Sequence, residues 1–117
     1  MCAVLIVEDH GDTRRTLASL LRNWGHAVSM ADNLASAVEF IEHKVFDVIL
    51  SDINLPDGDG YEFIAEIKKR QVPSMTAALT ALTSEADVQD ARRAGFDYHF
   101  AKPVDLQRLR SLLEIAA

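Results

Sequence analysis

The sequence predicts an α/β fold in which five parallel strands form a doubly wound sheet, in the order 2-1-3-4-5, with helices on both faces. Two observations lead to this prediction. Short apolar runs alternate along the whole chain with stretches of helical periodicity, which is typical of parallel strands joined by crossover helices. The runs over residues 3–7 and 46–51 both lead into carboxylates, which favours a switch point between the first and third strands, given right-handed crossovers.

The composition indicates a soluble globular chain of one domain. It has 117 residues, of which 49% are hydrophobic and 26% charged, so about two thirds of the unfolded surface can be buried. The net charge of −6 argues against direct nucleic-acid binding and favours proteins or a cation as partners. Cys2 is the only cysteine, and the apolar runs are too short for membrane insertion, so we expect a cytoplasmic protein.

The first strand is the apolar run over residues 3–7, and Asp12 is expected to cap the helix after it. Gly25 is expected to end this helix. Its apolar stripe has the spacing of an amphipathic helix, at Leu17, Leu20, Leu21 and Trp24. Residues 26–31 alternate weakly, which is typical of an edge strand.

The middle of the chain leads to a central carboxylate. Asn33 is expected to cap the second helix. Residues 46–51 are apolar almost throughout, which is typical of a strand buried on both faces, and Asp52 would lie at its carboxyl end. Residues 57–60 predict a turn, and Asp59 with Glu62 forms a capping box for a helix that runs to about Arg70.

The last two strands are predicted over residues 75–81 and 97–101. Between them, Ser84 with Asp87 predicts a capped helix that Gly95 closes. Its apolar stripe consists of alanines, which bury little area, so we expect this helix to be among the more weakly held elements. The final helix carries a stripe at Leu106, Leu109, Leu113 and Ala116.

Polar side chains stand at the predicted carboxyl ends of four strands, which parallel strands bring to one edge of the sheet. These are Glu8 and Asp9 after the first strand, Asp52 after the third, Thr80 on the fourth and Lys102 after the fifth. Two carboxylates about 4 Å apart repel by roughly 4 kcal/mol at an effective dielectric near 20, so the pocket needs a cation or a proton. A hard divalent cation with oxygen ligands, Mg²⁺, meets this need.

A calcium loop of the EF-hand type does not fit the same segment. That loop needs an oxygen ligand at its fifth position and Gly at its sixth, where counting from Asp52 gives Pro56 and Asp57.

The spaced set of strand-end residues resembles the receiver domain of two-component response regulators. The set is Glu8-Asp9, Asp52, Thr80-Ala81 and Lys102-Pro103, and the resemblance covers residues 1–117 as a single receiver domain of the chemotaxis-regulator kind. It implies the flavodoxin-like strand order and phosphoryl transfer to Asp52 from the phosphohistidine of a histidine kinase or histidine phosphotransfer protein. It also implies slow autodephosphorylation, in a phospho-acceptor signalling domain and not an enzyme. The chain could stand alone or be the receiver module of a hybrid histidine kinase.

The resemblance also assigns roles to the site residues. Glu8, Asp9 and Asp52 would hold Mg²⁺, with the backbone carbonyl of Asn54 as a further ligand.

The remaining two groups of the site would contact the phosphoryl oxygens. Lys102 supplies a positive charge and Thr80 a hydroxyl donor, with Thr83 as the rival for the hydroxyl. Pro103 restricts the backbone of the lysine before it, and in the family this peptide bond is often cis.

Phosphorylation in the family draws the strand-four hydroxyl, here Thr80, inward, and an aromatic residue on strand five follows it. The face made by the fourth helix, fifth strand and fifth helix then changes for a downstream protein partner. His99 occupies that aromatic position, and because histidine is smaller and titratable, this departure bears on the strength of the coupling. Leu82 is a candidate shield of the phosphoryl group against water.

Two alternatives stay open. A phosphatase of the haloacid dehalogenase type also phosphorylates an aspartate, but it expects Asp-x-Asp after its first strand, and this chain has Asp52-Ile53-Asn54 after its third. A receiver-like scaffold that never takes phosphate is the other alternative, which the complete set of site residues disfavours.

Overall fold

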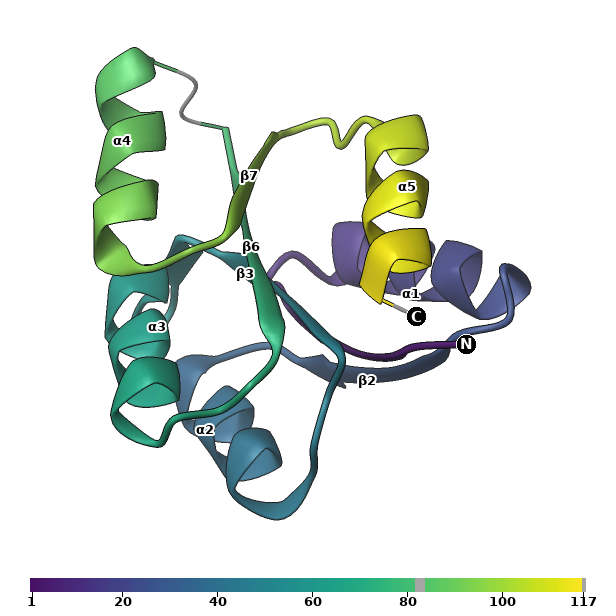
Figure 1. Ribbon diagram of the computed structural model, residues 1–117, viewed down its shortest axis with the longest axis horizontal. Coiled ribbons are helices and arrows are strands. Elements are labelled where there is room, and N and C mark those ends of the chain that lie inside the picture. The colour runs from purple at the N-terminus through teal and green to yellow at the C-terminus, as the bar shows by residue number, and fades with distance from the viewer. Residues whose placement is uncertain (82–83, 117) are drawn as a thin grey trace.

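The computed structural model describes residues 1–81 and 84–116 of the chain. Its main sheet contains β1 (Ala3–Val7), β2 (Ala27–Ala31), β3 (Val48–Asp52), β6 (Met75–Thr80) and β7 (Tyr98–Ala101). Its helices are α1 (Gly11–Asn23), α2 (Leu34–His43), α3 (Gly60–Lys69), α4 (Glu85–Ala94) and α5 (Leu106–Ala116). The strands pair in parallel in the order β2-β1-β3-β6-β7, which confirms the predicted doubly wound, flavodoxin-like arrangement (Figure 1).

The helices cover both faces of this sheet, as predicted. Successive strand side chains point to opposite faces, so each strand feeds two cores. On one face, α2, α3 and α4 cover a core that includes Leu5, Val7, Ile49, Ile41, Phe63, Ile64 and Ala91. On the other face, α1 and α5 cover a core that includes Val4, Ile6, Leu50, Leu17, Leu21, Leu109 and Leu113. Burial on both faces holds the central strands rigidly and fixes the edge at which their carboxyl ends lie.

Most predicted helix caps are present, with one error. The side chains of Asn33, Asp59 and Ser84 accept hydrogen bonds from backbone amides of α2, α3 and α4, respectively. The predicted cap Asp12 is wrong, because α1 begins at residue 11 and His10 caps it, with its Nδ1 accepting from the backbone N–H of residue 13. Asp12 instead lies in the first turn and forms an exposed ion pair with Arg15 at 2.9 Å.

The segment after β3 differs from the predicted turn. It forms a short antiparallel hairpin of β4 (Asn54–Leu55) and β5 (Gly58–Asp59), which leads directly into α3. The third strand itself lies slightly later than predicted, so that Asp52 is its last residue and not the residue after it.

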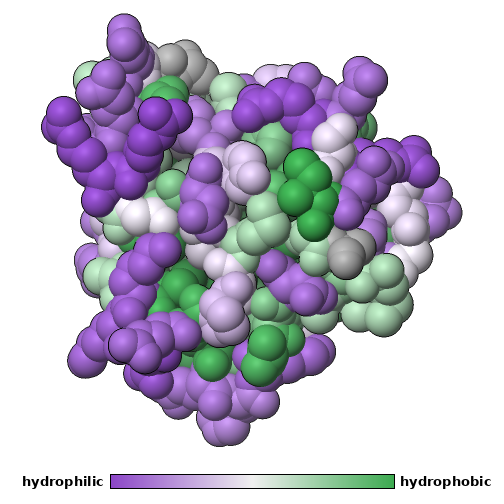
Figure 2. Space-filling view, in the orientation of Figure 1, coloured by the Kyte–Doolittle hydropathy of each residue, from purple (hydrophilic) through white to green (hydrophobic). Residues whose placement is uncertain are grey.

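Helix α4 has a thinner apolar stripe than the alanines of the sequence predict, because Ala86 is exposed and Ala94 is half-buried. Ala91 is its buried residue, and strongly hydrophilic side chains cover its outer surface, at the upper left of Figure 2. Weak attachment of this helix stays a prediction. In residues 1–81 and 84–116, the structure has no helix of the length and apolarity needed to cross a bilayer.

Candidate functional site

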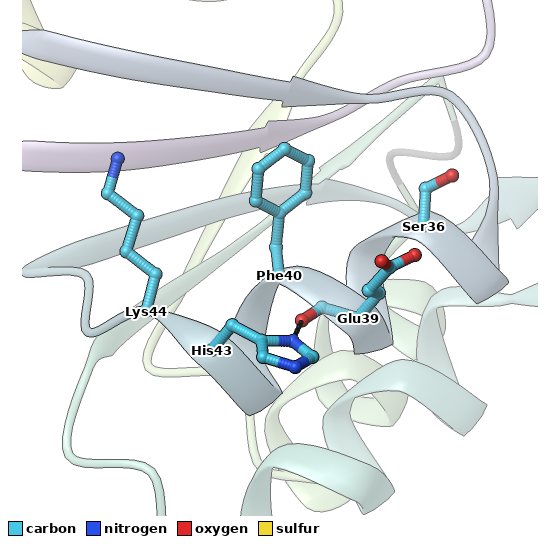
Figure 3. A pocket seen from close by; sticks show the side chains of 5 residues that line it. All are labelled: Ser36, Glu39, Phe40, His43 and Lys44. Carbon is cyan, nitrogen blue, oxygen red and sulfur yellow. Dashed lines mark hydrogen bonds between the residues drawn. The ribbon is translucent and has the colours of Figure 1, made fainter.

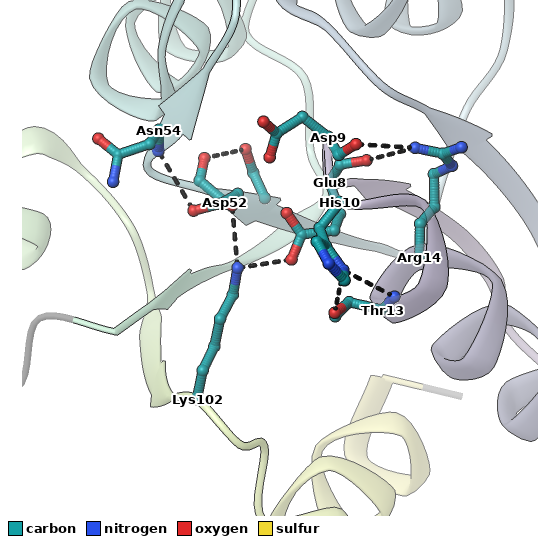
Figure 4. Close-up of polar contacts among 9 residues, drawn as sticks. Glu8, Asp9, His10, Thr13, Arg14, Asp52, Asn54 and Lys102 are labelled. Atoms are coloured by element: carbon teal, nitrogen blue, oxygen red, sulfur yellow. Dashed lines mark hydrogen bonds and ion pairs between the residues drawn. The ribbon is translucent and has the colours of Figure 1, made fainter.

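Three carboxylates from two strands lie together at one edge of the sheet. One carboxylate oxygen each from Glu8, Asp9 and Asp52 lies within 4.8 Å of the others. The register explains this meeting, because Val7 of β1 pairs with Ser51 of β3 and the next residues of both strands emerge at the same edge. The gathering predicted from strand ends is therefore present in the fold (Figure 4).

Lys102 brings a positive charge into the same cluster from the end of β7. Its Nζ donates to Glu8 Oε1 at 2.5 Å and to Asp52 Oδ2 at 2.9 Å. Its backbone N–H donates to the carbonyl of Thr80 at 2.9 Å, and its peptide bond to Pro103 is cis. The ammonium thus lies between two carboxylates that are far apart in the sequence.

The close packing of these charges separates the pKa values of the two paired carboxyls. Burial and the neighbouring Asp52 raise the pKa of Glu8 to about 7, although Lys102 opposes the shift. Burial would also raise the pKa of Asp52, but the neighbouring Glu8 carboxyl and the hydrogen bonds from Lys102 and the Asn54 amide outweigh burial and lower it. Burial opposes the charge of Lys102, yet its contacts with Glu8 and Asp52 raise its pKa. Near neutral pH, Asp52 is ionised, while Glu8 is poised between its two forms.

The site residues fit a hard divalent cation. Glu8 is fully buried, and its Oε2 has no hydrogen-bond partner in the part of the chain that the structure describes. A buried carboxylate oxygen without a donor is costly, and a cation or a proton would satisfy it. Asp9 is exposed at the rim and offers an accessible ligand beside the two buried ones. Three carboxylates, one of which is exposed, form an oxygen-rich site of the type that Mg²⁺ prefers.

Asn54, the further predicted metal ligand, lies on the hairpin beside Asp52. Its backbone N–H donates to Asp52 Oδ1 at 3.2 Å, while its side chain is exposed. It pairs with Asp59 across the hairpin. Gly60 closes the loop where a Cβ would lie 2.6 Å from the carbonyl oxygen of Asp52, which requires glycine there.

Thr80, the predicted hydroxyl donor, is buried at the end of β6, opposite Ala101 of β7. Its rival Thr83 and the candidate shield Leu82 lie outside the described residues.

His99, the predicted switch residue, lies in β7 opposite Ala78 and is half-buried. Its Nε2 is buried without a hydrogen-bond partner among residues 1–81 and 84–116. Its carbonyl accepts from Arg108 of α5 at 3.4 Å.

Sequence reasoning missed two residues that border the cluster. Arg14 donates through one guanidinium nitrogen to the carbonyl of Glu8 at 2.9 Å and to that of Asp9 at 3.4 Å. His10, the cap of α1, also contacts Thr13 Oγ at 2.9 Å (Figure 4). An arginine one turn into the helix that follows an acidic pair is the signal that could have identified the first contact.

Two grooves differ in their relation to this site. One, of about 680 Å³, adjoins Lys102 between α1 and the β7–α5 connection and is mainly apolar. Its lining includes Thr13, Leu17, Leu20, Pro103, Val104 and Leu106. The other, of about 480 Å³, lies along α2 around Phe40 and His43, and none of the three clustered carboxylates lines it. The His43 Nδ1 contacts the carbonyl of Glu39 there at 2.9 Å (Figure 3).

Comparison with known proteins gives one consistent picture. The family model of the response regulator receiver domain matches residues 4–114. Transcriptional regulatory protein ZraR of Klebsiella oxytoca is 34% identical over 113 residues, covering 97% of this chain and 26% of that protein. Sensor histidine kinase RcsC of Salmonella typhi is 30% identical over 114 residues, covering 97% of this chain and 12% of that protein. The chain therefore spans about a quarter or less of these two relatives.

Among solved structures, the chemotaxis response regulator CheY4 of Vibrio cholerae superposes with a TM-score of 0.90 at 27% identity. The match covers 100% of this chain and 99% of that one.

Proposed function

The chain belongs to the response regulator receiver domain family of two-component signalling systems, and from this premise we propose that it is a phosphorelay receiver. In this proposal, Asp52 accepts a phosphoryl group from a phosphohistidine while Mg²⁺ is bound. The observation that carries it is the meeting of Glu8, Asp9 and Asp52 within 4.8 Å, with the ammonium of Lys102 on two of the three.

Asp52 is the proposed nucleophile. Its lowered pKa keeps a carboxylate oxygen ionised, and this oxygen attacks the phosphorus atom as the bond from phosphorus to the donor imidazole breaks. The leaving imidazole keeps the electron pair of that bond, and an acyl phosphate forms on Asp52. Slow attack of water on phosphorus would later release inorganic phosphate and restore the carboxylate.

The other side chains would neutralise the incoming charge. Glu8, Asp9, Asp52 and the Asn54 carbonyl would hold Mg²⁺. The ion would supply positive charge against the phosphoryl oxygens and permit their approach to three carboxylates. Lys102, which is already beside Asp52, would donate to a phosphoryl oxygen.

Thr80 would donate its hydroxyl to a second phosphoryl oxygen from the end of β6. Its movement would be passed to His99 and hence to the face made by α4, β7 and α5, where a downstream protein binds. Tyr98 and Ile115 lie on this face as large apolar side chains with exposed fractions of 36% and 72%.

The donor protein would dock on the apolar groove beside Lys102. Lys102 lines this groove and contacts the acceptor carboxylate, so a helix of a histidine kinase or histidine phosphotransfer protein seated there would bring its phosphohistidine towards Asp52. The acidic charge of the chain disfavours direct contact with nucleic acid. The absence of cysteine pairs in the sequence and the family membership support a cytoplasmic location.

Phosphotransfer profiling tests the proposal. Purified histidine kinases and phosphotransfer proteins of the source organism are first labelled with radioactive phosphate and then mixed with the wild-type chain, Asp52→Asn or Glu39→Gln. Glu39 is an exposed carboxylate of α2 outside the groove proposed for docking, so its variant controls for loss of a negative charge. We expect label on the wild type and on Glu39→Gln, and none on Asp52→Asn. Equal labelling of Asp52→Asn would show that another residue is the phosphoryl acceptor. If no donor labelled the wild type or either variant, the receiver-like scaffold that never takes phosphate would be favoured.

A further inference from the structure

The carboxylate of Asp57 joins the β4/β5 hairpin to helix α2. Its Oδ1 accepts from the backbone N–H of Leu34 at 2.6 Å, and its Oδ2 accepts from that of Ala35 at 3.0 Å. These amides belong to the first turn of α2, whereas Asp57 lies in the turn of the β4/β5 hairpin, more than twenty residues later. The two hydrogen bonds lower the pKa of Asp57, so the carboxylate is ionised over the physiological range.

The hairpin held in this way carries Asn54. Residues 54 and 55 of β4 pair with residues 59 and 58 of β5, and the Asn54 N–H donates to the carboxylate of Asp52. The turn also lies tightly against α2, because a Cβ on Gly58 would come 2.7 Å from the Leu34 Cδ2. The position of the Asn54 backbone therefore depends on how the turn is fixed to α2.

Capping of α2 does not depend on Asp57 alone. Helix α2 already has a cap from the residue that precedes it, since Asn33 Oδ1 accepts from the Ser36 N–H at 2.7 Å. Asp57 adds bonds to the two preceding amides from outside the helix. Charge-assisted bonds of this type are short and directional, so they fix the donor and the acceptor segments relative to each other.

We propose that Asp57 is a positioning residue, which fastens the β4/β5 hairpin to the first turn of α2 and thereby holds the Asn54 backbone in register with Asp52 for Mg²⁺ binding. This inference rests on the proposed function, because it assigns the purpose of the contact to the metal site. Asp57 itself touches neither the metal nor the phosphoryl group.

The test compares Asp57→Ala with two matched variants. Asn33→Ala removes the other side-chain cap of α2 and leaves the hairpin contact intact. Glu62→Gln removes an exposed carboxylate whose Oε2 lies 3.0 Å from where a Gly58 Cβ would be, so it controls for the loss of negative charge near the hairpin. Mg²⁺ affinity is measured by NMR titration of backbone amides, without phosphodonor. Thermal denaturation and hydrogen exchange of the Asn54 amide are measured on the same samples without metal.

We expect Asp57→Ala to weaken Mg²⁺ binding by about 10-fold, the lower end of what loss of an outer-shell contact costs at metal sites. The Asn54 amide should exchange faster in this variant. Asn33→Ala should lower the melting temperature to a similar extent while Mg²⁺ affinity and Asn54 exchange stay at wild-type values, and Glu62→Gln should bind Mg²⁺ as the wild type does.

Two results would overturn the inference. Equal effects of Asp57→Ala and Asn33→Ala on Mg²⁺ affinity and Asn54 exchange would reduce Asp57 to a helix cap. An equal loss of affinity in Glu62→Gln would reduce it to a source of negative charge. If the wild type bound no Mg²⁺, the proposed function would fail first, and unchanged Asn54 exchange in metal-free Asp57→Ala would still reject the positioning role separately.

Discussion

Replacement of Lys102 by methionine removes the positive charge at the centre of the cluster while keeping an unbranched side chain of similar length. Glu8 Oε1 and Asp52 Oδ2 then lose their hydrogen bonds from Nζ at 2.5 and 2.9 Å. Both carboxyls are buried, at 0% and 9% side-chain exposure, so water cannot fully replace the ammonium. We therefore expect Lys102→Met to be destabilised in the absence of Mg²⁺.

The size of the loss follows from these contacts. Two hydrogen bonds to charged groups contribute roughly 3–6 kcal/mol together. Removal of the lysine also removes its own desolvation cost, and Glu8 can take up a proton, so we expect a net loss of about 2–3 kcal/mol. With an unfolding entropy of about 2.1 cal/mol/K per residue, the melting temperature of a chain of this length should fall by about 8–12 °C.

The loss of stability in Lys102→Met should increase as the pH rises. Without the ammonium, the pKa of Glu8 rises further above its ordinary 4.5 than the value of about 7 that it has beside Lys102. A carboxyl group whose pKa is raised in the folded state contributes stability that is complete below its ordinary pKa. This stability is lost as the pH rises through the pKa of the folded state. The stability of Lys102→Met should therefore be closest to that of the wild type near pH 4.5 and furthest below it above about pH 7.

Thermal denaturation followed by circular dichroism measures this loss, at both pH values, with and without Mg²⁺. Lys69→Met, at an exposed position of α3, is the control for loss of a lysine. Saturating Mg²⁺ should narrow the gap between Lys102→Met and the wild type, because the ion supplies the missing charge. If Lys102→Met without Mg²⁺ melted together with Lys69→Met above about pH 7, Lys102 would not be the group that neutralises the carboxylates.

Three further substitutions have expected outcomes. Thr80→Ala should still be phosphorylated on Asp52 but lose the phosphorylation-induced NMR shifts at α4, β7 and α5, and retained shifts would assign the switch to Thr83. His26 accepts the Cys2 N–H at 3.0 Å, and burial lowers its pKa. The stability that neutral His26 contributes is therefore complete above its ordinary pKa of 6.5 and is lost as the pH falls through its lower pKa in the folded state. In urea denaturation, the free energy of unfolding of His26→Gln should therefore fall less on acidification than that of the wild type. Gly60→Ala would place a Cβ 2.6 Å from the Asp52 carbonyl, so we expect slower phosphorylation by a small phosphodonor, and a wild-type rate would show that the loop yields without moving Asp52.

The sheet order and the carboxylate cluster could be predicted because both depend on local signals. Each buried strand is an apolar run, and residues such as Glu8 and Asp52 stand where these runs end. Parallel pairing then brings the ends together without further information. Helix caps were predictable for the same reason, except where the ring nitrogen of His10 took the place expected for Asp12.

The contacts that were missed are mostly long-range. Two-residue strands such as Asn54–Leu55 have no periodicity to detect, so the hairpin was predicted only as a turn. The bonds from the first turn of α2 to Asp57 join residues whose spacing carries no pattern. Lys102 was assigned to the phosphoryl group, and its ion pair with Glu8 could not be predicted because it depends on how β1 and β7 project across the sheet.

Intact-mass measurement of the chain after incubation with acetyl phosphate, with Mg²⁺ or with a chelator, tests most directly whether the carboxylates form a magnesium-dependent acceptor. We predict the mass increase of one phosphoryl group in the wild type only when Mg²⁺ is present, and none in Asp52→Asn under either condition. Phosphorylation of equal extent with the chelator, or an undiminished increase in Asp52→Asn, would contradict the proposal.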